Sequence, residues 1–115
     1  MKKFLVLYCM PHSGLVDWMA KDESYRKEEE EKMKKAWDEW TAAHKEMLLE
    51  TAGAGKTTKV TKGSSVDSHN DIMMYSLVQG ENKEVVAKVF EDHPHFGIPE
   101  AWIDVMEANI LPMGN

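Results

Sequence analysis

Hydrophobic residues along the chain form three short β-prone runs, the first two nearly continuous, and two stretches with helical spacing. The runs at residues 4–10, 72–78 and 102–110 predict β-strands, and the charged, β-prone stretch at residues 57–62 predicts an edge strand. Residues 63–71 are rich in serine and aspartate and begin with Gly63, a composition that predicts a polar loop.

The longer periodic stretch predicts one helix over residues 24–51, after a loop or short helical turn. Asp22 or Ser24 is the expected cap, and Gly53 and Gly55 are expected to stop the helix. The positions that recur every three or four residues form the expected buried stripe: Met33, Trp37, Trp40, His44 and Met47 or Leu48.

A second helix is expected from Asn82 to about Asp92, because its apolar positions share one face and Pro94 cannot continue it. The order is then β-α-β-β-α-β over a single domain, residues 1–115. This order predicts a ferredoxin-like α+β fold, with a four-stranded antiparallel sheet and two helices on one face.

The first and third strands do not alternate apolar and polar residues, although one face of such a sheet has no helices. In residues 4–10 both sets of alternating positions are apolar, and in residues 72–78 only Ser76 is clearly polar. A large exposed apolar patch is unusual on a monomer. We therefore expect a homodimer whose sheets pack face to face, with a cavity between sheet and helices or between the sheets.

Composition narrows the class of protein. A formal charge of −6 disfavours nucleic acid as a partner, and no run reaches the roughly 20 apolar residues of a membrane span. Lys2 and Lys3 before an apolar run resemble a signal peptide, but Pro11 ends the run early and no cleavage site follows. Cys9 is the single cysteine, so an intrachain disulfide is excluded and a cytoplasmic location is the simplest expectation.

Several short motifs together resemble those of the YCII-related proteins, including their DGPF-domain relatives. These are "MKKFLVLY", the tryptophan-containing first helix, "AGAGKTTKV", "NDIMMYSLVQGEN", "HPHF" and "IDVME", which span nearly the whole chain. The resemblance implies a dimeric α+β barrel of ferredoxin-like subunits. For some members a His–Asp pair has been suggested to support an enzymatic role, and related barrels include lactone isomerases and lyases that act on small organic acids.

The family motifs match this sequence in part. The family often has Asp-Pro after the second helix, whereas His93 precedes the proline here. A histidine on the first helix of some members falls near Trp37 or Trp40. In the closing motif Asp104 keeps an acid, while Met106 stands where the family often has arginine.

The segment "DHPHF" carries the candidate chemistry. Histidine titrates near neutral pH, so His93 or His95 is the candidate general acid or base, with Asp92 or Asp104 as the orienting carboxylate. His93 shares the apolar face of the second helix, which predicts that it points inward. The alternative for each histidine is a structural role, as a satisfied core residue or at the helix end.

The candidate pocket wall combines aromatic and histidine positions on the first strand, the loop after it and the first helix: Tyr8, His12, Trp37, Trp40 and His44. A metal site is not expected, because no third ligand motif accompanies the two histidines. "GAGKTT" lacks the first glycine of a phosphate-binding loop and follows a helix rather than a strand. No cofactor is expected.

The sequence therefore predicts a dimeric α+β barrel protein that handles a small molecule. If it is an enzyme, the expected reaction is isomerisation or lyase chemistry on a small organic acid. The alternative is a non-catalytic dimeric ligand-binding or accessory module.

Overall fold

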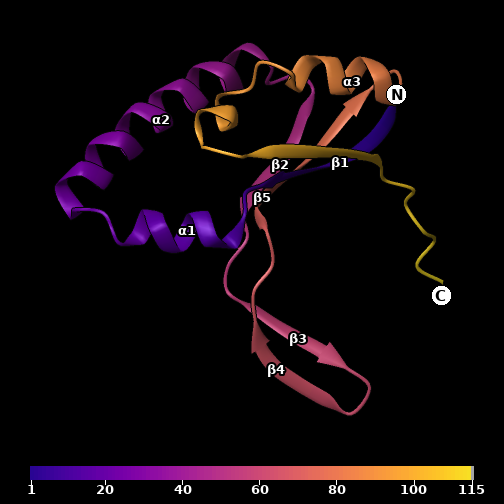
Figure 1. Ribbon diagram of the computed structural model, residues 1–115. Helices are drawn as coiled ribbons and strands as arrows, with labels where there is room; N and C mark the ends of the chain where they lie inside the picture. The colour runs from indigo at the N-terminus through magenta and orange to yellow at the C-terminus, as the bar shows by residue number, and fades with distance from the viewer. Residues whose placement is uncertain (115) are drawn as a thin grey trace.

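The computed structural model describes residues 1–114 as an α+β fold built on one four-stranded antiparallel sheet (Figure 1). The strands of this sheet lie in the order β2-β5-β1-β6. Its strands are β1 (Lys2–Cys9), β2 (Leu48–Gly53), β5 (Ile72–Gly80) and β6 (Trp102–Glu107). The expected four-stranded antiparallel sheet is thus present, with β2 and β6 at its edges.

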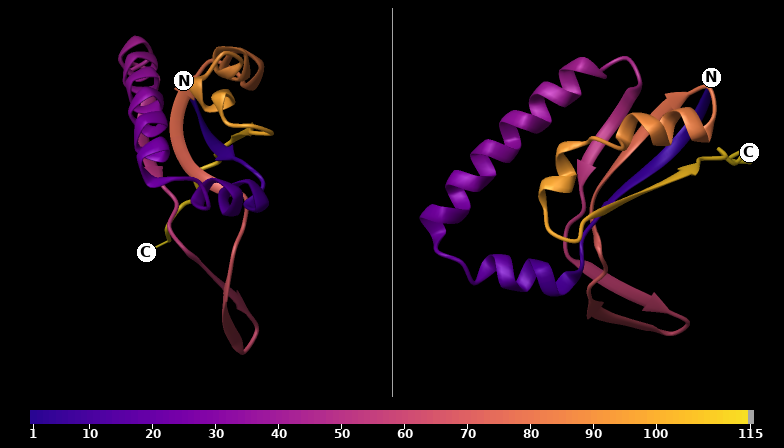
Figure 2. Two further views of the ribbon diagram at one scale, coloured as in Figure 1. Left: turned by 60° about the vertical axis from the view of Figure 1, so that its left-hand side comes forward. Right: turned by 45° about the horizontal axis from the view of Figure 1, so that its top comes forward.

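Three helices and one short 3-10 turn connect the strands. They are α1 (His12–Met19), α2 (Glu23–Ala43), α3 (Lys83–Phe90) and η1 (Pro94–Gly97). The helix α3 and the turn η1 lie across the sheet, and the long helix α2 runs beside them (Figure 2). None of the described helices is long and apolar enough to cross a membrane.

One face of the sheet forms the core against α2 and α3. Phe4, Val6 and Tyr8 of β1 are buried there, together with Trp40 of α2 and Phe90 of α3. Because side chains of a strand alternate between the two faces, the residues between them point to the other side. The two expected helices therefore cover the same face of the sheet.

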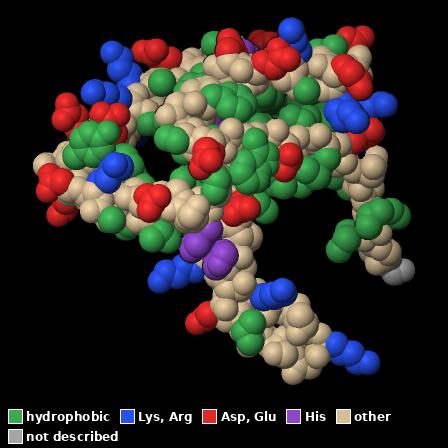
Figure 3. Space-filling view, in the orientation of Figure 1, with side chains coloured by type: hydrophobic (Ala, Val, Ile, Leu, Met, Phe, Trp, Pro, Cys, Tyr) green, Lys and Arg blue, Asp and Glu red, His purple; other side chains and the backbone are tan. Residues whose placement is uncertain are grey.

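The other face of the sheet carries apolar side chains that no helix covers. They come from three adjacent strands and are half-buried or exposed: Leu5, Leu7, Tyr75, Leu77, Trp102 and Met106. We call these six residues the open face. The space-filling view shows hydrophobic side chains gathered where the sheet lies (Figure 3). The prediction that both faces of the first and third strands are apolar is confirmed.

The predicted long helix was wrong at its carboxyl end. The helix α2 stops at Ala43, and residues 48–53, expected to be its last turn and stop, form the edge strand β2 instead. His44 caps the helix, and its Nδ1 lies 2.8 Å from the carbonyl oxygen of Trp40. Antiparallel pairing of β2 with β5 supplies the hydrogen bonds that a longer helix would have made.

The polar segment between β2 and β5 was also predicted incorrectly. Residues 57–62 do form a strand, β3 (Thr57–Thr61), but it does not join the main sheet. It pairs with β4 (Ser64–Ser68), which was expected to be loop. Gly63 turns between them at a φ of 77°, a left-handed conformation that favours glycine. The resulting hairpin projects from the rest of the chain (Figure 1).

Gly80, at the end of β5, packs directly against Val86 of α3. A methyl group added there would overlap Cγ2 of Val86, which is buried in the core. Gly80→Ala is therefore expected to lower the free energy of unfolding by about 1–3 kcal/mol, as overpacking does in well-filled cores.

Urea unfolding followed by circular dichroism measures this effect. Gly53→Ala is the matched control, because nothing lies within 4 Å of a Cβ at that position. Adding Val86→Ala to Gly80→Ala should relieve the overlap, so the double variant should lose less than the two single effects combined. Equal unfolding midpoints for Gly80→Ala and Gly53→Ala would contradict the close approach.

Candidate functional site

The segment "DHPHF" folds into a tight turn that buries both of its histidines. Pro94 opens the 3-10 turn η1, where its fixed φ and missing N–H suit the first position. His93 caps this turn, because its Nδ1 accepts the backbone N–H of His95 at 2.9 Å. Each histidine side chain is 2% exposed. The prediction that His93 points inward is confirmed.

His93 lies inside a cluster of aromatic rings. Its ring centroid is 4.3 Å from those of Trp37 and Trp40, 5.1 Å from that of Tyr8 and 5.8 Å from that of Phe90. We call these five residues the aromatic cluster. Three of the predicted pocket residues are therefore brought together with His93, from β1 and α2.

The hydrogen bond to Nδ1 fixes the proton position on His93. Because Nδ1 accepts a hydrogen bond, the neutral ring carries its proton on Nε2. Burial lowers the pKa of His93 to about 4, helped by the neighbouring histidines His95 and His44 and opposed by Asp92. The ring is therefore neutral at pH 7 and presents Nε2–H as a donor.

Two buried donors of the aromatic cluster have no hydrogen-bond partner among the described residues. They are Nε2–H of His93 and Nε1–H of Trp40, whose side chain is 8% exposed. An unsatisfied buried donor costs roughly 1–3 kcal/mol. Both groups therefore gain free energy from any acceptor oxygen that reaches them.

The side chain of His95 has a hydrogen-bond partner in the backbone. Its Nε2 lies 2.8 Å from the carbonyl oxygen of Cys9, so the ring donates there and ties η1 to the end of β1. Burial lowers the pKa of His95, while the backbone groups of Cys9 and Trp102 act in the opposite direction. His95 thus has a positioning role, since its ring nitrogen is already used by the fold.

His44 connects the aromatic cluster to the surface. It is half-buried, stacks on Trp40 at 4.1 Å and donates Nδ1–H to that residue's carbonyl oxygen. It also lines an open pocket of about 240 Å³ formed by residues 42–47. Rings of His44, Trp40 and His93 therefore follow one another from this pocket into the interior.

A chain of hydroxyl groups ends at the aromatic cluster, and sequence reasoning missed two of its members. Tyr8 Oη lies 2.7 Å from Ser76 Oγ, which lies 2.7 Å from Thr51 Oγ1 on the edge strand β2. Burial raises the pKa of Tyr8, partly offset by the bond to Ser76. Ser76 was detectable as the one polar residue in an apolar strand, whereas Thr51 was assigned to the wrong element.

The remaining predicted site residues lie elsewhere. Asp92 is exposed beside the cluster, and Asp104 is exposed on the face of β6 away from the helices, where it accepts Trp102 Nε1–H at 3.3 Å. Neither carboxylate hydrogen-bonds to His93 or His95 among the described residues. His12 stacks on His69 at 3.9 Å, at the base of the β3–β4 hairpin.

Cys9 is buried at the end of β1. Burial raises the pKa of its thiol, and the charges of Asp104 and Asp71 raise it further. Within residues 1–114 no three His, Cys, Asp or Glu side chains are placed to hold a metal ion.

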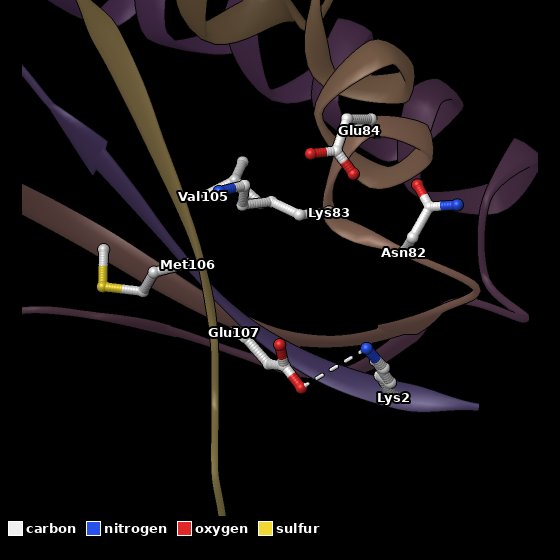
Figure 4. Close-up of a pocket in the computed structure, with 7 residues that line it drawn as sticks. All are labelled: Lys2, Asn82, Lys83, Glu84, Val105, Met106 and Glu107. Atoms are coloured by element: carbon white, nitrogen blue, oxygen red, sulfur yellow. Dashed lines mark ion pairs between the residues drawn. The ribbon is translucent and has the colours of Figure 1, made fainter.

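A second open pocket, of about 340 Å³, involves none of the predicted site residues. Figure 4 shows it between the start of α3 and the β1–β6 pair. Lys2 and Glu107 face each other across it at 4.0 Å, and Asn82, Lys83 and Glu84 complete the polar wall. Its mixed charges favour no single ligand class.

Comparisons with known proteins do not assign the chain to a family. No protein-family model matches the chain, and no curated protein matches its sequence.

The buried neutral His93 makes stability depend on pH. Its folded-state pKa lies below its unfolded value, so the unfolded chain binds a proton at higher pH. The stability contributed by His93 is fully present above pH 6.5 and is lost as pH falls towards 4. The loss at the acidic end is about 3 kcal/mol.

Unfolding free energies measured between pH 4 and 7.5 check this. His93→Asn keeps an oxygen acceptor for the His95 N–H but cannot titrate, so its pH profile should be flatter. His69→Asn, at an exposed position, should keep the wild-type profile. Parallel profiles for His93→Asn and wild type would show that His93 is not the group responsible.

Proposed function

We propose that the chain is a small-molecule-handling subunit of a dimeric α+β barrel of the YCII-related type, with His93 as its functional donor. The observation that carries this is the buried Nε2–H of His93, held neutral and without a protein partner beside the equally unpartnered Nε1–H of Trp40. These two unsatisfied donors would bind a ligand that has acceptor oxygens, such as a carboxylate or a lactone.

The electronic state of His93 favours a donor role over that of a base. A ring whose conjugate acid has a pKa of about 4 is a weak base at pH 7. A neutral imidazole can nevertheless polarise a carbonyl or donate to a developing oxyanion through its N–H group. The expected isomerase or lyase chemistry on a small organic acid would then use His93 as the electrophile.

Tyr8 and its hydroxyl partners supply the second chemical feature of this proposal. The Tyr8 ring packs on His93, and its hydroxyl group belongs to the chain through Ser76 to Thr51 at the sheet edge. Each hydroxyl both donates and accepts, so a proton released near Tyr8 has a hydrogen-bonded route towards solvent. Thr51 is the exposed end of that route.

A non-catalytic ligand-binding or accessory module is the alternative, and one specific observation favours it. Within residues 1–114 neither Asp92 nor Asp104 hydrogen-bonds to His93 or His95, so the His–Asp pair expected for catalysis is not assembled within one subunit. In that case the aromatic cluster serves stability, with His93 as the cap of η1.

The proposed dimer interface is the open face. The strand order β2-β5-β1-β6 with α2 and α3 on one side fits a ferredoxin-like subunit, and the open face is where a second sheet would pack. We propose that two copies bury this face against each other around a twofold axis. The apolar side chains that no helix covers are then shielded from water.

Ligand binding is tested by thermal shift with a panel of small aliphatic and aromatic carboxylic acids and lactones. A ligand that binds the folded state at 100 times its Kd stabilises it by about 2.7 kcal/mol, which raises Tm by about 10 °C in a domain of this size. Trp40→Phe removes one donor, and His93→Asn replaces the ring Nε2–H by a shorter amide that does not extend to the same position, so each variant should reduce the shift. The surface variant His69→Asn should retain it.

The two functional hypotheses give different results in this assay. An acid or lactone that shifts wild type and His69→Asn but not His93→Asn supports the donor role. Equal shifts in all variants would remove His93 from the binding site. Turnover of a bound lactone or acid, followed by NMR, separates an enzyme from a binding module.

The dimer is tested by a charge on the open face. Leu77→Lys should convert the dimer to monomers in sedimentation velocity, because burying an unpaired ammonium group costs several kcal/mol. Val85→Lys, at an exposed position on α3, is the matched control and should stay dimeric. A wild-type chain that sediments as a monomer at micromolar concentration would contradict the dimer.

A further inference from the structure

The β3–β4 hairpin lies outside the body of the subunit. Every residue of its two strands is exposed except Thr57, which is half-buried, and the strands pack chiefly on each other. The radius of gyration is 16.2 Å, compared with about 13 Å for a compact chain of this length. Figures 1 and 2 show the hairpin projecting away from the sheet and helices in every view.

The hairpin has no apolar face of its own to hold it together. Val60 and Val66 are 73% and 53% exposed and point to opposite sides of the ribbon, and most of the other side chains are serine, threonine or charged. An isolated two-stranded hairpin is marginally stable in water. The ten residues of β3 and β4 would therefore be stabilised by packing on a second protein surface.

Hydrogen bonds at the base of the hairpin fix the direction in which it projects from the subunit. Asn70 donates to Thr57 Oγ1 at 3.1 Å and accepts the N–H of Ile72 at 2.9 Å, which joins the start of the hairpin to its end. Asp71 accepts the backbone N–H of His12 at 3.1 Å, and the His12 ring stacks on His69. The hairpin is thus tied to the start of α1 and held away from its own subunit.

The charge of the hairpin is opposite to that of the chain as a whole. Lys56, Lys59 and Lys62 face a single carboxylate, Asp67, in this segment, whereas the whole chain has a formal charge of −6. Outside this segment the chain has 11 lysines and arginines and 19 aspartates and glutamates, a formal charge of −8. Residues 28–31 of α2 are four consecutive glutamates, flanked on the same helix by Lys27 and Lys32, and Glu28 and Glu29 pair with Lys32. A basic projection and an acidic body are complementary between two copies.

We propose that the β3–β4 hairpin is an arm that packs on the acidic surface of a second copy of this chain and is exchanged symmetrically between the two subunits. The arm brings its lysines and two free strand edges, whose N–H and C=O groups are available for pairing. This inference rests on the proposed dimer, because a twofold axis gives both arms the same contact. It adds a second contact region to the open face.

Removal of the arm tests the proposal. In one variant residues 57–68 are replaced by Asn-Gly, a sequence suited to a two-residue turn between paired strands. Sedimentation equilibrium should show a dimer Kd at least tenfold higher than that of wild type, and far-UV circular dichroism confirms that the subunit is folded. An unchanged dimer Kd would overturn the arm and leave the open-face dimer standing. A monomeric wild type would overturn both.

Charge reversal tests the complementarity without deleting any backbone. Lys59→Glu with Lys62→Glu should raise the dimer Kd most strongly at low salt, since interactions between exposed charges are screened as ionic strength rises. Lys83→Glu, at the start of α3, is the control with an unchanged Kd. Equal Kd values for the double variant and wild type at low salt would contradict the charge complementarity.

Direct contact is visible by NMR in a dimer mixed from labelled and unlabelled chains. Isotope-filtered spectra should show intersubunit contacts from the methyl groups of Val60 or Val66. A dimer in which both valines give intrasubunit contacts only would overturn the proposal even if the sheets pair.

Discussion

The packing of Trp37 on Tyr8 of β1 and of Trp40 on Phe90 of α3 is the contact on which the rest of the subunit depends. Trp40 is the one buried residue of α2, and it contacts Phe90 of α3 and His93, the cap of η1. A long, highly charged helix is thus held to the sheet largely by one turn of aromatic residues. The remaining length of α2 carries charged side chains of both signs, several of them paired along the helix, and these face solvent.

The sequence predicted most of the sheet and the core, because those elements carry strong local patterns. The central strands are continuous apolar runs, and the stripe on α2 follows helical spacing up to Trp40. The carboxyl end of α2 was wrong because residues 44–51 fit a helix locally. Pairing of β2 with β5 decides that segment, and this long-range contact leaves no periodic signal.

The candidate site was predictable in its members and less so in its geometry. The inward direction of His93 and its proximity to Trp37 and Trp40 followed from helical spacing. The cap on η1, the hydroxyl chain through Ser76 and the distant position of Asp104 depend on strand register, which one-dimensional spacing does not encode. The second strand of the hairpin, β4, was missed because it has no apolar face to produce alternation.

The chemistry of His93 follows from the local backbone. Pro94 has no N–H to donate, so the first free N–H of the turn belongs to His95, and His93 Nδ1 accepts it. That bond places the proton on Nε2, and the aromatic rings around the imidazole disfavour a second proton. The same arrangement that stabilises the turn therefore makes His93 a donor at neutral pH. A carboxylate next to Nδ1 would compete with the cap, which gives a physical reason why Asp92 and Asp104 stand apart from it.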